Sequence, residues 1–226
     1  MRRRDSPADH PCAMMARTQK SAGIDLREAC LAEAMAIINT AGVERLSLRE
    51  VARRIGVSHQ APYRHFASRD HLLAEIVRRA YADFAAALRA APRTADPAAD
   101  SLAMGLAYVR FALTEPLKYR LMFGGSLPDP VAHPEMMRGA RDAFEVLRTA
   151  LARIPAARGE TPDREAIDSE ALFAWSSLHG VVSLLRTDAM GTLDLAPGAR
   201  DAFVMQALQR IGAGLGMAGN TQGEGA

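Results

Sequence analysis

The segment Ser47-Leu-Arg-Glu-Val-Ala-Arg-Arg-Ile-Gly-Val-Ser-His-Gln-Ala-Pro-Tyr-Arg-His-Phe66 carries the main signals in this 226-residue chain. Ser47 and Glu50 have the spacing of a capping box, which predicts the start of a short helix. Gly56 ends this helix after barely two turns, and Ser58 is the next residue that can cap a helix. Two short helices on either side of a glycine turn form a helix-turn-helix unit.

The second of these helices, expected from Ser58 to about His65, is short and densely polar. A helix in this position fits the major groove of DNA, and residues near its N-terminus reach base edges. Gln60 can form two hydrogen bonds with adenine, and Ala61 can contact a thymine methyl group. Because Pro62 removes one helical hydrogen bond, we expect a short helix with a distorted opening. The alternative is a pair of packed helices whose polar side chains are merely solvated.

Basic groups flank this helix at positions suited to the DNA backbone. Arg49 lies in the first turn of the preceding helix, within reach of a phosphate or a guanine. Arg69 follows Ser68, which caps the next helix, and is placed for a phosphate. The helix N-terminus at Ser58 offers free backbone N–H groups to a further phosphate.

The charge of the chain is concentrated in the same region. The whole chain has a formal net charge of +2, yet residues 1–81 hold 14 Lys and Arg against 9 Asp and Glu. Residues 45–79 hold eight Arg against three acidic residues. A basic part joined to a mildly acidic part favours one domain that faces a polyanion and another with a different task. A solvated helix face rich in arginine is the other interpretation.

The rest of the chain is interpreted as helical throughout. Hydrophobic residues make up 49% of the sequence and aromatic residues 5%, while alanine, the best helix former, is abundant. Before and after the unit, helices are predicted over 25–41 and from Ser68 to about residue 90. In the second half, apolar helices cut by proline and glycine are predicted near 100–114, 117–123, 134–154, 164–188 and 198–215. This gives an all-α fold of about nine helices: a three-helix head and an antiparallel bundle.

The predicted domain boundaries follow from changes in composition. Pro92 and Pro97 separate the head from the bundle, and the sequence before residue 24 has no hydrophobic periodicity. We therefore expect a flexible arm over 1–23, a DNA-binding domain with its connecting helix over 24–90, an effector-binding and dimerisation domain over 97–217, and a disordered tail over 218–226.

The quoted segment, followed by Ser68-Arg-Asp-His-Leu-Leu73, resembles the DNA-binding domain of TetR-type (tetracycline-repressor-like) transcriptional regulators over about residues 25–85. The resemblance implies a dimer that places two heads on a palindromic operator. This family typically has lysine where Arg69 stands, and arginine keeps the charge. Residue types and resemblance together predict DNA contacts at Ser47, Arg49, Ser58, His59, Gln60, Ala61, Tyr63, Arg64, His65 and Arg69.

A second, shorter resemblance concerns the C-terminal half. Ala174-Trp-Ser-Ser-Leu-His-Gly180, with Tyr119-Arg-Leu-Met-Phe123 upstream, is similar to a subgroup with a Trp…His-Gly stretch on its penultimate helix. A bundle with flexible methionines and few internal charges can bind a small molecule between its helices. The predicted effector pocket comprises Met104, Tyr108, Phe111, Met122, Phe123, Phe144, Trp175 and His179. The alternative for each of these residues is an ordinary place in the core.

The last two helices are predicted to pair with the same helices of a second chain. Such an isologous contact would hold two heads about one duplex turn apart, roughly 34–36 Å. The residues predicted at this dimer interface are Leu178, Val182, Leu185, Phe203, Ala207, Leu208 and Ile211.

Several other sites are excluded by their context. Gly214-Leu-Gly-Met-Ala-Gly219 has the spacing of a dinucleotide motif but follows a helix rather than a strand. Cys12 and Cys30 form neither a disulfide framework nor a zinc site, and no cofactor or metal is predicted. No apolar run is long enough to cross a membrane, and the start, Met1-Arg-Arg-Arg, is unlike a signal peptide, so a cytoplasmic protein is expected.

These features predict a homodimeric, sequence-specific regulator of transcription. We expect it to act as a repressor that a small apolar effector releases from DNA, and we expect no enzymatic activity. One alternative is an architectural protein that binds DNA without sequence preference. The other is an all-α enzyme acting on an apolar substrate, with His179 or His133 as its base. Neither alternative explains both the charge distribution and the helix-turn-helix spacing.

Overall fold

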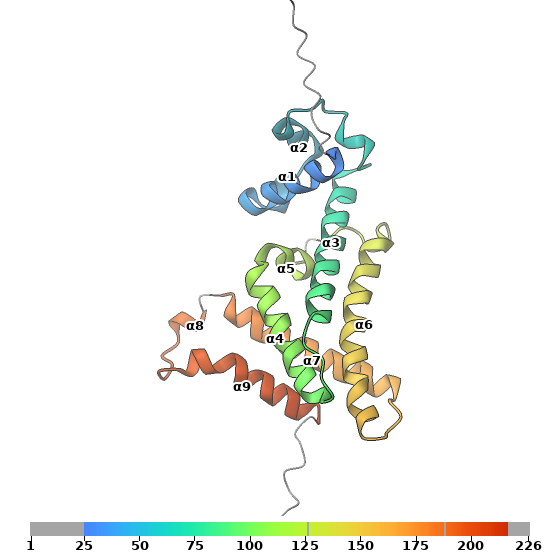
Figure 1. Ribbon diagram of the computed structural model, residues 1–226. Coiled ribbons are helices and arrows are strands. Elements are labelled where there is room, and N and C mark those ends of the chain that lie inside the picture. The colour runs from blue at the N-terminus through green and yellow to red at the C-terminus, as the bar shows by residue number, and fades with distance from the viewer. Residues whose placement is uncertain (1–24, 126, 188, 217–226) are drawn as a thin grey trace, which may run out of the picture.

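The computed structural model describes residues 25–125, 127–187 and 189–216, and these ranges contain nine α-helices, two 3-10 turns and no strand. The all-α prediction is therefore confirmed, while the predicted arm and tail lie outside the described residues. Figure 1 shows a small head above a larger helical domain, joined by one long helix. The elements are α1 (Leu26–Ala41), η1 (Val43–Arg45), α2 (Leu48–Ile55), η2 (Pro62–Arg64), α3 (Arg69–Arg89), α4 (Pro97–Thr114), α5 (Pro116–Phe123), α6 (Pro134–Ala157), α7 (Arg164–Leu185), α8 (Ala189–Thr192) and α9 (Ala199–Gly214).

The head forms where the capping signals predict it. Asp25 accepts a hydrogen bond from the backbone N–H of Arg27, and Ser47 accepts one from that of Glu50 at 3.2 Å. Gly56 ends α2 with a φ of 73°, a left-handed conformation that glycine adopts without strain. Ser68 caps α3 by accepting from the N–H of His71 at 3.1 Å.

The prediction of a short α-helix from Ser58 to His65 is wrong. Residues 59–61 form a turn, and only η2 (Pro62–Arg64) is helical, with 3-10 hydrogen bonds. The physical reason is Pro62, which has no backbone N–H to donate back along a helix. Its own carbonyl accepts from the N–H groups of both His65 and Phe66 at 3.0 Å, which closes the segment tightly.

Three predicted boundaries in the second half also shift. The helix expected over 164–188 ends at Leu185, and α8 follows it as a separate turn. The helix expected over 134–154 continues through Pro155 to Ala157. The helix expected from residue 100 begins at Pro97, because Asp96 caps it by accepting from the N–H of Ala98 at 2.9 Å.

The helix α3 belongs to both domains. It contributes ten buried residues, from Leu72 beside the head to Leu88 in the second domain, to one continuous hydrophobic core. It packs along α6 for much of its length and also contacts α4 and α5. One helix therefore connects the core of the head to that of the second domain.

Candidate DNA-binding surface and effector cavity

The segment from Ser58 to His65 presents its polar side chains outward. Ser58, His59, Gln60, Arg64 and His65 are exposed, and the ring of Tyr63 is 44% exposed. Ala61 is partly exposed. Pro62 and Phe66, by contrast, are buried, so they hold the segment on the head while its polar groups stay free. This is the orientation that contact with DNA requires.

The arginines near this segment fall into two groups. Arg53 and Arg54 both hydrogen bond to Glu50, at 2.6–2.8 Å, and these bonds lower the pKa of Glu50 to about 2. Arg49 and Arg64 have no ion-pair partner within the described ranges. Their charges are therefore available to an external anion.

A hollow on the surface of the head lies beside this segment. Its lining residues are Arg49, His59, Gln60 and Tyr63. It therefore combines one free cation with several hydrogen-bonding groups, as a phosphate-binding or base-reading surface does. Four of the ten predicted DNA-contacting residues therefore lie together at this hollow.

Arg69 has a structural partner that the sequence did not reveal. Its Nε donates to the carbonyl of Leu46 at 3.1 Å and its Nη2 to that of Val43 at 2.7 Å. Its Nη1 also pairs with Asp70 at 2.8 Å. The guanidinium therefore joins η1 to the start of α3, and its contact with a phosphate stays a prediction.

An ion-pair network joins the head to α3. Glu28 on α1 accepts two hydrogen bonds from Arg79, both at 2.6 Å. Glu75 accepts from Arg78 and Arg79 and pairs with Arg27 of α1 at 2.9 Å. The hydrogen bonds from Arg78, followed by those from Arg79 and Arg27, lower the pKa of Glu75 to about 2. The network fixes the angle between α1 and α3.

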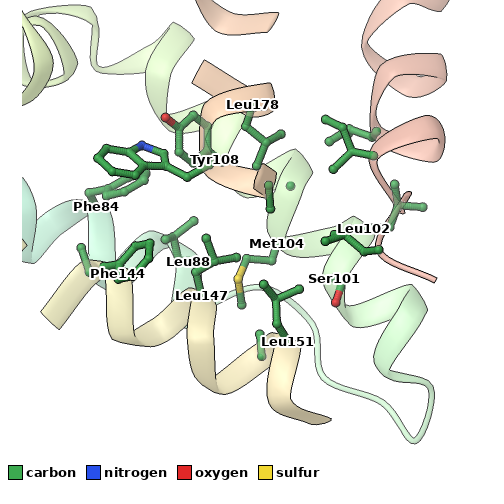
Figure 2. A pocket seen from close by; sticks show the side chains of 18 of the residues that line it. Phe84, Leu88, Ser101, Leu102, Met104, Tyr108, Phe144, Leu147, Leu151 and Leu178 are labelled. Atoms are coloured by element: carbon green, nitrogen blue, oxygen red, sulfur yellow. The ribbon is translucent and has the colours of Figure 1, made fainter. Parts of the chain in front are cut away.

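The second domain encloses a cavity of about 110 Å³ between α3, α4, α6, α7 and α9, with Phe123 of α5 at its edge. None of its lining side chains is charged. Figure 2 shows Phe84, Leu88, Leu147 and Leu151 facing the same space as Met104 and Leu178. The lining residues are Tyr81, Phe84, Leu88, Ser101, Leu102, Met104, Gly105, Tyr108, Phe123, Ala140, Ala143, Phe144, Leu147, Ala150, Leu151, Ala174, Trp175, Leu178, Leu208, Ile211, Gly212 and Leu215.

Five of the eight residues predicted for the effector pocket line this cavity: Met104, Tyr108, Phe123, Phe144 and Trp175. The other three lie outside the lining of this cavity. Phe111 lines a separate groove between α3 and α4, and Met122 is buried behind the cavity wall. His179 does not line the cavity, and its Nδ1 lies 2.7 Å from the hydroxyl of Tyr119.

The predicted pocket contained no residue of α3 and only Phe144 of α6. Phe84 and Leu88 are spaced four apart on α3, which places them on one face of that helix. Leu147 and Leu151 are spaced four apart on α6, which places them on one face. The periodicity therefore indicated these buried faces, whereas the cavity between them depends on how the helices pack.

A chain of polar side chains borders the cavity. The hydroxyl of Tyr108 is 2.9 Å from that of Tyr119, which is 2.7 Å from Nδ1 of His179. Burial raises the pKa of both tyrosines, while burial and the charge of Arg186 lower that of His179. The guanidinium of Arg186 lies 5.1 Å from the centre of the Tyr119 ring. These hydrogen-bonded side chains link α4, α5 and α7.

The seven residues predicted at the dimer interface differ in burial. Leu178 and Leu208 are buried and line the cavity of their own protomer, and Val182 is fully buried. Ile211 also lines the cavity but is partly exposed, as are Leu185, Phe203 and Ala207. The interface itself stays a prediction.

The outer surfaces of α7 and α9 carry other apolar side chains. Leu172 and Leu184 of α7 are 54% and 47% exposed, and Met205 of α9 is 39% exposed. Leu193 and Leu195, in the segment between α8 and α9, are exposed as well. Exposed apolar side chains gathered on neighbouring elements are typical of a protein–protein interface.

The fold and the surface of the head define a two-domain helix-turn-helix protein with a cavity in its second domain, and the comparisons agree. Residues 31–76 match the profile of the bacterial regulatory proteins of the tetR family, and residues 101–211 match that of the tetracyclin repressor-like C-terminal domain. The chain belongs to the TetR family of helix-turn-helix transcriptional regulators. This confirms the family resemblance, while the Trp…His-Gly subgroup stays a prediction.

Individual relatives support the same assignment. The chain is 35% identical over 103 residues to the HTH-type transcriptional regulator Rv1816 of Mycobacterium tuberculosis, and the match covers 43% of this chain and 43% of that protein. The HTH-type transcriptional regulator Mb1846 of Mycobacterium bovis matches to the same extent. The chain thus aligns with less than half the length of these curated relatives.

Solved structures extend the similarity to both domains. A protein of unknown function from Rhodococcus sp. RHA1 is 31% identical, with a TM-score of 0.71, over 87% of this chain and 98% of that one. A tetR-family regulatory protein from Rhodococcus RHA1 has a TM-score of 0.61 at 21% identity, over 84% of this chain and 98% of that one, which shows a shared fold. Among the described residues, no helix is both long and apolar enough to cross a membrane.

Proposed function

We propose that this protein is a homodimeric repressor that binds a palindromic operator and leaves it when a small apolar molecule occupies the second domain. The observation that carries this proposal is the shared use of α3. Its first turn follows directly after the exposed segment from Ser58 to His65, and its later turns supply Tyr81, Phe84 and Leu88 to the cavity wall. A change in the cavity therefore acts on the element that orients the head.

The proposed contacts with DNA divide into two kinds. Gln60, which is exposed, and Ala61, which is partly exposed, reach base edges, because an amide can pair with adenine and a methyl group can contact that of thymine. Arg49, Arg64, Tyr63 and the polar groups of the turn contact the backbone and set the register. The complete proposed set remains Ser47, Arg49, Ser58, His59, Gln60, Ala61, Tyr63, Arg64, His65 and Arg69.

The proposed dimer uses the outer surfaces of α7 and α9. Leu172, Leu184 and Met205 form its apolar centre, with Leu185, Phe203 and Ala207 at its edge. Gly180 lies on the same side of α7, and nothing is near the position its side chain would occupy, so a partner helix can approach closely. An isologous contact of this kind places two heads for adjacent turns of one duplex face, roughly 34–36 Å apart.

In the proposed mechanism, the change that ligand binding causes in the second domain reaches α3 through its contact with α6. At Gly139 of α6 an added Cβ atom would lie 3.3 Å from the Cβ atom of Tyr81, so the two helices are in close contact there. On the opposite side, the hydroxyl of Tyr81 donates to the carbonyl of Met122 in α5 at 2.9 Å. A molecule that separates these helices favours a second arrangement of α3. The size of the response is limited by the difference in its affinity for the two arrangements.

The proposal is tested by selecting bound fragments from the source genome and footprinting them. A short protected palindrome with strongly salt-dependent affinity is the expected result. Protection that is uniform along the DNA would instead favour an architectural protein. Turnover of a small molecule without any binding to DNA would favour an enzyme. We propose a cytoplasmic location, where the protein meets its operator.

A further inference from the structure

The cavity has two chemically different ends. Figure 2 shows Phe84, Phe144 and Tyr108 gathered at one end and Leu102 and Leu151 at the other. The ring centres of Phe84 and Tyr108 are 5.2 Å apart with nearly perpendicular planes, and those of Phe144 and Trp175 are 6.0 Å apart. Aromatic groups in these arrangements expose faces and edges against which another flat ring packs well. One end therefore suits an aromatic ring, and the other suits a short aliphatic group.

The lining excludes a charged ligand. None of the side chains around the cavity is acidic, basic or histidine. An ionised group placed there would lose its hydration and gain no counter-ion, which is strongly unfavourable. The molecule that fits this cavity is therefore uncharged.

The volume limits the size of the ligand. A cavity of about 150 Å³ lined by apolar side chains binds benzene in an engineered protein, and the cavity here measures about 110 Å³. The flexible side chain of Met104 stands in the wall and can move aside at little cost. A single aromatic ring is thus about the largest group that fits the cavity as it stands, and a short substituent on that ring requires the side chain of Met104 to move.

Polar groups around the cavity differ in their freedom to bond with a ligand. The hydroxyl of Ser101 donates to the carbonyl of Pro97 at 2.8 Å, and that of Tyr81 donates to the carbonyl of Met122. Each of these two hydroxyls donates its single hydrogen in these bonds. The hydroxyl of Tyr108 instead bonds to that of Tyr119 and accepts a hydrogen bond from the indole of Trp175. A hydroxyl has one donor and two acceptor positions, so one position of Tyr108 is left for a ligand, and it is a donor or an acceptor according to the direction of the Tyr119 bond.

The direction of the hydrogen bonds between Tyr108, Tyr119 and His179 decides whether the hydroxyl of Tyr108 offers a donor or an acceptor to the cavity. If His179 accepts at Nδ1, Tyr119 donates to it and Tyr108 donates to Tyr119, which leaves an acceptor at Tyr108. With the other tautomer of the imidazole, each bond reverses and Tyr108 has a free donor. A hydroxyl both donates and accepts, so it pairs with Tyr108 in either state.

We propose that the cavity binds a compact, uncharged, alkyl-substituted phenol, with its ring against Phe84 and Phe144 and its hydroxyl bonded to that of Tyr108. This inference deepens the proposed function, since it names the chemical class of the effector. It depends on the cavity alone for binding, and on the proposed function only for the effect of binding on DNA.

The experiment uses the full-length protein and three probes of similar shape: p-cresol, toluene and 4-methylbenzoate. Trp175 is the single tryptophan of the chain and lines the cavity, so its fluorescence reports occupancy directly. Isothermal titration calorimetry provides a second readout. We expect p-cresol and toluene to bind and the carboxylate to bind at least about a hundredfold more weakly, because its charge would be buried without a partner. Equal affinity for p-cresol and 4-methylbenzoate would overturn the proposal.

The variant Y108F tests the position of the hydroxyl. Removal of one hydrogen-bonding group should weaken p-cresol binding roughly three- to tenfold. Toluene is the matched control, and its affinity should change less than twofold. Equal losses for both probes would mean that Tyr108 only shapes the wall, and the proposed pose would be wrong. The wild-type comparison of charged and uncharged probes needs no variant, so it decides whether the ligand is uncharged even if Y108F does not fold.

Operator release is measured separately by adding p-cresol to the complex with selected DNA. Binding to the cavity without release of DNA would support the ligand class and count against the proposed regulation. Release by a different molecule, with no binding of p-cresol or toluene, would support the regulation and overturn the ligand class. The two proposals therefore fail on different results.

Discussion

The hydroxyl of Tyr81 on α3 donates a 2.9 Å hydrogen bond to the backbone carbonyl of Met122 on α5. Both groups are buried, and burial raises the pKa of Tyr81 to about 12. The same ring contributes to the cavity wall. One side chain thus fixes the distance between the connecting helix and the helix that closes the end of the cavity.

The variant Y81F should lower the free energy of unfolding by about 1–3 kcal/mol, because the carbonyl of Met122 loses its partner in a buried site. Denaturant titration of the full chain measures this change. The matched control is Y63F, whose ring is 44% exposed on the head, and it should stay within about 0.5 kcal/mol of the wild type. A loss of equal size in both variants would contradict the structural role assigned to Tyr81.

Arg49 provides a test of the DNA-binding surface. R49A should weaken operator binding, and if the contact is to a phosphate, the slope of log affinity against log salt should fall by about one. Affinity measured at several salt concentrations gives both quantities. R138A is the control, since Arg138 lies on α6 and pairs with Glu135 at 2.8 Å. An unchanged operator affinity in R49A would mean that the head docks in another orientation.

The outer surface of α7 tests the proposed dimer. L184E places a charge in an apolar contact that occurs twice in a symmetric dimer, so the dissociation constant of the dimer should rise at least about tenfold. Sedimentation equilibrium measures it. Leu113 on α4 is the control, because its exposed fraction of 48% nearly equals the 47% of Leu184. If L113E dissociates the dimer and L184E does not, the interface lies on another face.

The network around Glu75 predicts a dependence of stability on pH. The pKa of this carboxyl falls from an ordinary 4.5 to about 2 in the folded protein, chiefly through its hydrogen bonds with Arg78. A lowered pKa stabilises the folded state above the unfolded value, and this stabilisation is lost as the pH falls through the folded value. The difference in unfolding free energy between wild type and E75Q should therefore be full at neutral pH and shrink between about pH 4.5 and 2. A difference that is the same at pH 2 and pH 7 would disprove this role.

The parts of the fold that local signals specify were predictable. Ser47, Gly56 and Ser68 act within one or two turns of the backbone, so their effects can be read from neighbouring residues. Pro62 showed that the recognition segment would be distorted, yet not that α-helical geometry would be lost altogether. The outcome depended on buried contacts of Pro62 and Phe66 with the rest of the head.

The cavity and the dimer surface were less accessible from sequence because both depend on packing between distant segments. Leu178 and Leu184 are both leucines of α7 at helical spacing, yet one lines the cavity and the other is 47% exposed. Hydrophobic periodicity identifies an apolar residue but not the neighbour it faces. For the same reason Arg69 seemed free for a phosphate, while its bonds to Val43 and Leu46 come from a loop more than 20 positions away.

The shortness of η2 has a consequence for mixed populations of protein. A recognition segment with so few helical residues can make few base contacts. In the proposed dimer, one head alone would therefore hold DNA weakly, and occupancy would rely on two heads acting together. A subunit with a damaged head but an intact α7 and α9 would still assemble with a normal one. Such a heterodimer would have one functional DNA-binding domain, so the altered allele would be dominant over the intact copy.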